Sequence, residues 1–311
     1  MPFYVAPDAL ILAIAGGLGA LIGSFLNVVI LRWPLMQERT WLTDSVNFLR
    51  ELGARNDDSP GQKLAARMVA AVAPEPELET FNLVVPRSRC PHCGHMIRAH
   101  QNIPILGWLL LRGRCGQCSA GINVRYPIIE LVTTLLSVYI VWQFGAGLAG
   151  GAALVLTWGL LAAAMIDADT MYLPDDITLP WLWIGLGVNS FGMFTSLESA
   201  VCGAIVGYLS LWSVYWLFKL CTGKEGMGYG DFKLLAMLGA WLGWEKLPLI
   251  VLLSSLVGAV IGVVLMVFRN SEASKPIPFG PYLAGAGWLA LVWGDDIMHT
   301  YMRVSGLGPP Y

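Results

Sequence analysis

Residues 226–235 read GMGYGDFKLL, and they lead into the apolar run LLAMLGAWLGW. Three alternating glycines precede Asp231, so an acidic side chain stands at the edge of a segment that is otherwise suited to lipid. An ionised carboxylate at the edge of a bilayer is costly, and such a residue therefore needs a functional reason. The rest of the sequence indicates what kind of protein places it there.

The composition is that of a protein that crosses a membrane many times. Of the 311 residues, 56% are hydrophobic and only 13% are charged, and the mean hydropathy is +0.62. A soluble domain of this length is nearer a quarter charged. The 35 Gly and 13 Trp fit helix contacts and membrane interfaces, respectively. We predict an all-α integral membrane protein in contact with lipid, and the net charge of −2 gives no indication of nucleic-acid binding.

Apolar segments long enough to cross a bilayer, about 20 residues, recur along the chain. We expect about eight transmembrane helices, over residues 9–31, 126–143, 148–166, 177–194, 198–218, 231–244, 247–268 and 280–298. The 231–244 segment is short, about 21 Å of helix. We therefore expect it to be tilted, partly buried in protein or preceded by re-entrant chain.

The distribution of positive charge predicts the orientation. Residues 32–125 hold 12 of the 19 Lys and Arg, whereas residues 1–8 hold none. Positive charge favours the cytoplasmic side, so we expect the N-terminus outside. The same side then receives the turns near 167–176 and 219–230, together with Lys219, Lys224, Arg269 and Lys275.

This pattern divides the chain into three parts. They are a first transmembrane helix at 1–31, a cytoplasmic loop module at 32–125 and a transmembrane helical core at 126–311. Within the module we expect residues 35–85 to form a small amphipathic or irregular insertion. The first span carries a stripe of small and polar residues that is suited to close helix contact, namely Gly16, Ala20, Ser24 and Asn27. A role for Asn27 near the substrate is the alternative.

Four of the six cysteines fall in two C-x-x-C pairs, Cys90 with Cys93 and Cys115 with Cys118. The gap of 21 residues between the pairs is compatible with a tetrahedral four-thiolate zinc site. Each pair lies in a glycine-containing, basic turn that can present backbone N–H groups to thiolates. Four ligands leave no open position, so this zinc would be structural. Two disulfides or free thiols are the alternative, and the cytoplasmic location argues against disulfides.

Histidine does not change this interpretation. His92 and His95 lie within the first cysteine turn and are alternative ligands, but four cysteines already complete the site. Neither histidine belongs to an H-E-x-x-H pair, so the sequence gives no support to a zinc protease.

A second acidic turn, MIDADTMYLPDDITLP, lies between two predicted spans and offers Asp167, Asp169, Asp175 and Asp176. Two carboxylates at one membrane depth can share a proton, because like charges a few ångströms apart do not both ionise easily. The ionised member then acts as general base on a water, and the protonated member polarises the scissile carbonyl. This is the chemistry of an aspartic protease. Ordinary interfacial helix caps are the alternative.

Several motifs in a fixed order resemble those of one family. They are GSFLNVVILRWP, CPHCGHMI, RCGQC, RYPIIELVT, IDADTMYLPDDITLPWLW, GMGYGDFKLLAMLGAWLG and PFGPYLAGA. Along nearly its whole length, the chain resembles the type IV prepilin peptidases, membrane aspartic peptidases of the G-x-G-D class. In that family the catalytic pair is the Asp seven residues before the Pro of the LPD turn and the Asp of G-x-G-D. These match Asp167 and Asp231, with Asp169 as a competitor for the first role.

The resemblance implies an activity at the bacterial inner membrane. It implies cleavage of the basic leader of prepilins and pseudopilins on the cytoplasmic side, serving type IV pili and type II secretion. It also implies N-methylation of the new terminus with S-adenosylmethionine, since the cysteine quartet and the long first loop look like those of bifunctional members. The sequence has no strand–glycine-rich loop–helix unit of the common soluble methyltransferases, so we expect an unusual pocket near the zinc-bearing loop and assign it no residues.

Two other classes of protein fit parts of the pattern. In a transporter or channel with a metal-bound cytoplasmic module, intramembrane acids relay protons or ions, and helix-breaking glycines suit that role equally well. In a scaffold without enzymatic activity, the zinc module docks pilus-assembly partners. Cleavage of a prepilin by the purified protein, and its loss in Asp→Asn variants, distinguishes the peptidase from both.

Overall fold

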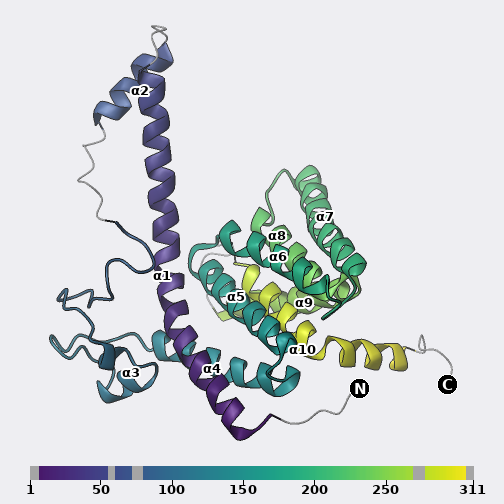
Figure 1. The fold of residues 1–311 in the computed structure, drawn as a ribbon. Coiled ribbons are helices and arrows are strands. Elements are labelled where there is room, and N and C mark those ends of the chain that lie inside the picture. The colour runs from purple at the N-terminus through teal and green to yellow at the C-terminus, as the bar shows by residue number, and fades with distance from the viewer. Residues whose placement is uncertain (1–6, 55–59, 72–79, 269–276, 306–311) are drawn as a thin grey trace. The chain divides into compact units, whose positions relative to one another are not determined.

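The computed structural model describes residues 7–54, 60–71, 80–268 and 277–305 (Figure 1). These residues are almost entirely helical or in turns and contain no β-strand, which confirms the prediction of an all-α fold. Arg269 and Lys275, used above for the orientation, lie outside the described residues. So do 55–59 and 72–79 of the predicted 35–85 insertion.

The chain forms two compact units. One comprises Met1–Gly23 and Ile129–Tyr311, and the other Ser24–Ile128. The described helices are α1 (Ala9–Gly53), α2 (Pro60–Ala71), α3 (Leu106–Leu110), α4 (Arg125–Phe144), α5 (Leu148–Thr170), α6 (Asp175–Asn189), α7 (Leu197–Thr222), α8 (Tyr229–Leu242), α9 (Leu247–Phe268) and α10 (Gly280–Val304), with 3-10 turns η1 (Ala99–Asn102) and η2 (Trp244–Lys246).

Each of the eight predicted spans corresponds to a helix, α1 or one of α4 to α10. Five described segments are long and apolar enough to cross a membrane: α1, α4, α5, α7 and residues 244–264 around α9. The protein is therefore an integral membrane protein, while the total of eight spans stays a prediction.

Helix α1 is much longer than its predicted span. Its 45 residues make about 68 Å of helix, whereas the hydrocarbon core is about 30 Å thick. The helix passes through Pro34 and ends at Gly53, where Gln62 of α2 donates a hydrogen bond to the Gly53 carbonyl at 3.2 Å. The segment after residue 31 is therefore a regular helical extension, and α2 packs beside its end.

The contact face of α1 is shifted by one residue from the predicted stripe. Ala15, Gly19 and Gly23 are buried, whereas Gly16, Ala20 and Ser24 are only partly buried. A Cβ on Gly19 would collide with Ser137 of α4, and one on Gly23 with the Glu130 backbone. The close approach of α4 therefore follows Gly19 and Gly23. Asn27 is buried as expected, and its amide donates to the Tyr126 carbonyl at 3.1 Å.

The short helix α8 forms the centre of the bundle. Eleven of its residues are buried, and it packs against α6, α7 and α10. Its close contact with α7 needs glycine on both helices. A Cβ on Gly203 would overlap the Gly239 carbonyl, and a Cβ on Gly239 would overlap the Gly203 carbonyl. The Asn189 amide of α6 donates to the Ala240 and Trp241 carbonyls at 2.8 and 2.9 Å. Of the expectations for this short segment, burial within protein is the one confirmed.

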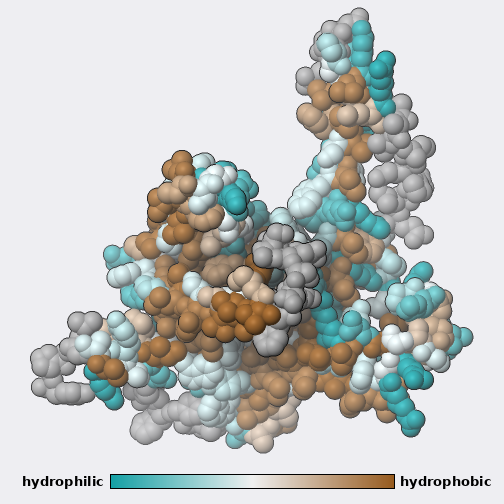
Figure 2. All heavy atoms as spheres, turned by 180° about the vertical axis from the view of Figure 1, so that it is seen from behind, coloured by the Kyte–Doolittle hydropathy of each residue, from teal (hydrophilic) through white to brown (hydrophobic). Residues whose placement is uncertain are grey.

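Apolar side chains also cover much of the visible helix surface (Figure 2). On α9, Leu252, Leu256, Val260 and Val263 are each more than half exposed. An exposed apolar helix face of this length suits contact with lipid.

Candidate active site and metal centre

Asp167 lies in the last turn of α5 and is buried, with an exposed fraction of 5%. The helix ends three residues later, where Met171 adopts the left-handed conformation and its N–H bonds to the Asp167 carbonyl at 2.8 Å. This is the αL type of helix termination. Asp169, two residues further along the same turn, is exposed. Because of the helix geometry, the side chain of Asp167 points into the protein and that of Asp169 does not.

Asp231 lies in the first turn of α8 and has an exposed fraction of 6%. An aromatic cluster packs beside this turn: the ring of Tyr215 lies 5.2 Å from that of Tyr229 and 5.7 Å from that of Phe232, measured between centroids. Asp231 is thus enclosed, and it is not the solvated helix end that an ordinary cap would be.

Two of the three glycines before Asp231, Gly226 and Gly230, serve close packing and not unusual backbone angles. Among the described glycines with positive φ, the nearest upstream is Gly223, which ends α7 at φ 69°. A Cβ on Gly226 would lie 2.9 Å from the Phe218 ring, and one on Gly230 would lie 2.6 Å from the Leu173 Cβ. Gly226 therefore fits against α7, and Gly230 of the G-x-G-D turn fits against the loop after α5.

Leu173 connects the surroundings of the two aspartates. It approaches Gly230, the neighbour of Asp231, and also Gly280, whose N–H donates to the Asp167 Oδ2 at 3.0 Å. The structure thus places both buried carboxylates at one end of the bundle, where the end of α5 and the beginnings of α8 and α10 meet.

The other acids of this turn have different surroundings. Asp175 accepts hydrogen bonds from Lys233 Nζ at 2.7 Å on both carboxylate oxygens. Because Lys233 belongs to α8, this pair ties the start of α6 to the helix that carries Asp231. Asp176 is exposed. The two buried carboxylates, Asp167 and Asp231, suit acid–base chemistry. The ion pair between Asp175 and Lys233 stabilises the helix ends beside them.

The four clustered cysteines lie in two turns with the same backbone pattern. In the first, the Cys90 N–H bonds to the His95 carbonyl, Gly94 N–H to the Cys90 carbonyl and Ile97 N–H to the Ser88 carbonyl. In the second, Cys115, Ser119 and Ile122 donate to the carbonyls of Ala120, Cys115 and Gly113. Gly94 and Ser119 occupy equivalent positions, and both have positive φ. We call these two turns the cysteine knuckles.

In the two knuckles, the four cysteine sulfurs all lie within 4.8 Å of one another. The Cys90 and Cys118 sulfurs are 3.8 Å apart, which is about the S···S separation of a tetrahedral site with Zn–S bonds of about 2.3 Å. All four thiols are free. The donor set therefore fits zinc, as the C-x-x-C spacing predicts.

The pKa values of two of the clustered thiols are shifted in opposite directions. Backbone N–H groups of Cys118 and Gln117 lower the pKa of Cys115 to about 6, which favours the thiolate that binds metal. Although the His95 N–H lowers the pKa of Cys93, desolvation and the neighbouring thiols raise it to about 12. A bound dication would offset that penalty.

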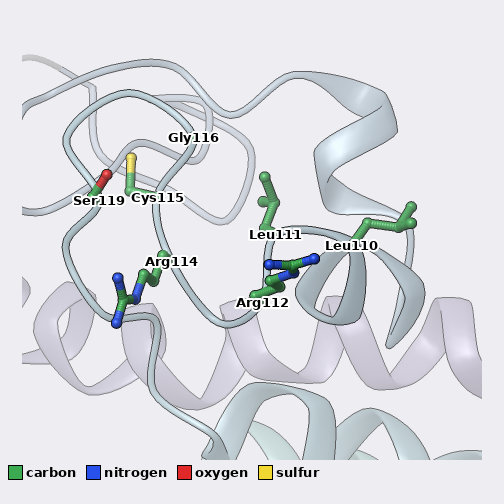
Figure 3. A pocket seen from close by; sticks show the side chains of 7 residues that line it. All are labelled: Leu110, Leu111, Arg112, Arg114, Cys115, Gly116 and Ser119. Atoms are coloured by element: carbon green, nitrogen blue, oxygen red, sulfur yellow. The ribbon is translucent and has the colours of Figure 1, made fainter.

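A hollow with a volume of about 570 Å³ lies beside the second knuckle (Figure 3). Leu110, Leu111 and Arg112 line it on one side, and Arg114, Cys115, Gly116 and Ser119 on the other. The described residues contain no strand–loop–helix unit, so this hollow has no resemblance to the nucleotide-type pockets of common methyltransferases.

Sequence reasoning missed three residues beside the aspartates. Gly280 bonds to Asp167, and Leu173 lies against Gly230 and Gly280, only in the folded structure. Lys233 pairs with Asp175, which is 58 residues away in the sequence, so no local pattern points to this pair. Of these, Gly280 had a signal, since it lies in the motif PFGPYLAGA.

Known families and proteins resemble the chain along most of its length. Residues 18–144 match the model of the Bacterial Peptidase A24 N-terminal domain, and residues 154–263 that of the Type IV leader peptidase family. Among similar curated proteins, the "Prepilin leader peptidase/N-methyltransferase" of Stutzerimonas stutzeri is 57% identical over 93% of each chain. The protein of the same name from Pseudomonas aeruginosa is 56% identical over 93% of this chain and 92% of its own length. The one from Pseudomonas putida is 50% identical over 98% of each chain.

No solved structure matches the chain significantly. The two family models together cover most of the sequence, one on each side of the short connection between α4 and α5. In each of these comparisons, the similar region covers nine-tenths or more of this chain and of the relative. The chain therefore belongs to the type IV leader peptidase family.

Proposed function

We propose that this protein cleaves the leader peptide of type IV prepilins and pseudopilins and then N-methylates the new N-terminal residue. One observation carries the peptidase half: two aspartates from distant parts of the chain, Asp167 and Asp231, are both buried at one end of a helix bundle. The matching family and the names of the relatives support the same activity and supply the argument for methylation.

The mechanism needs one proton shared between the two carboxylates. The ionised aspartate removes a proton from a water molecule, whose oxygen attacks the scissile carbonyl carbon while the protonated aspartate donates to the carbonyl oxygen. In the second step, a hydroxyl of the tetrahedral intermediate returns its proton to one carboxylate. The C–N bond breaks, and the amide nitrogen leaves as an amine after taking a proton from the other aspartate.

The location of the pair suits a substrate that is itself anchored in the membrane. The apolar helix of a prepilin can stay in lipid while its basic leader remains in the cytoplasm. The scissile bond then lies near the headgroups, at the depth of a helix end. We place the N-terminus outside and the site on the cytoplasmic face, where Lys219 and Lys224 are consistent with the positive-inside rule.

The cysteine knuckles are proposed to hold one structural zinc through Cys90, Cys93, Cys115 and Cys118. Four thiolates fill a tetrahedral shell, so this ion stabilises the module and takes no direct part in hydrolysis. For the methyl donor, S-adenosylmethionine, we assign no residues of this chain.

The peptidase is tested with purified full-length protein and a synthetic prepilin in detergent. We expect Asp167→Asn and Asp231→Asn each to lower the cleavage rate by at least about 10³-fold, the upper part of the range for a lost general acid or base. Methylation of an already cleaved pilin serves as the control for folding and should persist. Asp169→Asn is the matched control for Asp167, since it lies exposed on the same turn.

Two results would reject the peptidase assignment. One is a normal cleavage rate in either Asp→Asn variant. The other is a wild-type protein that conducts ions or transports solute but leaves the prepilin intact, which would favour the transporter class.

A further inference from the structure

The motif PFGPYLAGA, residues 278–286, has a contact that the proposed mechanism has not used. It lies beyond residues 154–263, which match the peptidase family model. Gly280 of this motif begins α10, and its backbone N–H reaches Asp167, which is 113 residues away in the sequence.

The contact is specific to glycine at position 280. The Gly280 N–H donates to Asp167 Oδ2 at 3.0 Å. A Cβ at this position would lie 2.5 Å from the same oxygen and 3.1 Å from Leu173 Cδ1. A side chain here would therefore have to displace the Asp167 carboxylate or the loop after α5.

The partial charges of the two helix ends act in opposite directions on the Asp167 carboxylate. Asp167 lies in the last turn of α5, where the partial negative charge of a helix C-terminus disfavours a carboxylate. The N-terminus of α10, a helix of 25 residues, carries the opposite partial charge. Pro281 follows directly and has no N–H, so the Gly280 amide is the donor that this end of the helix directs at Asp167.

We propose that the first turn of α10 is a third component of the active site, in which Gly280 is a positioning residue for Asp167. Its amide fixes Oδ2 and leaves Oδ1 as the oxygen that acts on water or shares the proton with Asp231. This inference rests on the proposed catalytic function of Asp167.

The kinetic test uses Gly280→Ala in the full-length protein, with Gly285→Ala as the matched control. Gly285 lies in the same helix, and a Cβ there meets nothing within 4 Å. We expect Gly280→Ala to lower kcat for prepilin cleavage roughly 100-fold, the effect of misplacing a catalytic group by about 1 Å, without changing KM or methylation of cleaved pilin. Gly285→Ala should match the wild type. An unchanged kcat in Gly280→Ala, or a rise confined to KM, would overturn the proposal.

A second measurement decides the matter if Gly280→Ala loses both activities through misfolding. The first amides of a helix have no partner within it, so exchange protection at Gly280 depends on Asp167. Hydrogen exchange in protein labelled with ¹⁵N-glycine should show a protected Gly280 amide in the wild type and an unprotected one in Asp167→Ala. A Gly280 amide that exchanges freely in the wild type would overturn the proposal. Normal cleavage by Asp167→Asn would instead reject the proposed function.

Discussion

In the cysteine module, hydrogen bonds within two short turns place the four thiols, whereas in the helix bundle the packing of distant segments places the two carboxylates. Each knuckle repeats the same three backbone bonds around its own C-x-x-C pair. Asp167, Asp231 and Gly280 come from three helices and meet only through tertiary contacts.

The difference indicates how each region responds to change. A knuckle needs its local turn and a metal to join it to the other knuckle, so the loss of one ligand should unfold a small region. The aspartates instead depend on glycines that let helices and loops approach. There, the addition of one methyl group should misplace a catalytic group while the fold persists.

The largest expected effect is on the module, from Cys115→Ser. Structural zinc contributes on the order of 10 kcal/mol to the folding of small zinc modules, and a three-thiolate site would lose most of it. We expect loss of bound zinc and rapid proteolysis within residues 80–125, while cleavage of a short prepilin peptide persists. Cys202→Ser, an exposed cysteine of α7, is the control. Less than one zinc per wild-type chain would contradict the metal assignment, and so would full zinc content in Cys115→Ser.

The second prediction concerns the bundle. In Gly230→Ala the new Cβ would lie 2.6 Å from the Leu173 Cβ, so the first turn of α8 must shift. We expect kcat for cleavage to fall roughly 10- to 100-fold, with zinc content unchanged. Gly187→Ala, whose Cβ would meet nothing within 4 Å, should cleave normally. A wild-type rate in Gly230→Ala would show that the close fit is unimportant.

A smaller effect is expected from Lys233→Ala, which removes the pair with Asp175. The lysine side chain is 28% exposed and the aspartate 45%, so we expect a loss of at most about 1 kcal/mol and a fall of a few fold in kcat/KM. Lys246→Ala removes a different ion pair, with Asp295, beyond the other end of α8 and should leave cleavage unchanged. Equal effects of the two substitutions on cleavage would argue against a bracing role at the site.

The smallest effect concerns Glu225, which precedes the glycine turn. Lys219 Nζ lies 2.8 Å from its Oε1 and lowers the pKa of Glu225. A lowered pKa stabilises the fold above the unfolded value of about 4.3, and this stability is lost as the pH falls through the folded value. The Tm difference between wild type and Glu225→Gln should therefore be small at pH 7 and shrink below about pH 4. A difference independent of pH would contradict the assignment.

The sequence predicts the module better than the site. The sulfur cluster follows from the two C-x-x-C pairs because the geometry of each pair is set within a few residues. The positions of the helices can be predicted from the apolar runs. The end of α1 cannot, because the residues after Pro34 continue the helix without being apolar enough for lipid. The burial of Asp167 and the exposure of Asp169 depend on which face α5 turns inward. The Gly280 contact depends on the packing of α10, which no local pattern encodes.

The central claim is that Asp167 and Asp231 act as one unit, and a double-mutant comparison tests it most directly. Residues that act as a unit are strongly non-additive. The account predicts that Asp167→Asn, Asp231→Asn and the double variant all cleave prepilin at the same residual rate, while each still methylates a cleaved pilin. A double variant slower by the product of the two single effects would contradict a shared mechanism, as would a single variant with the wild-type rate.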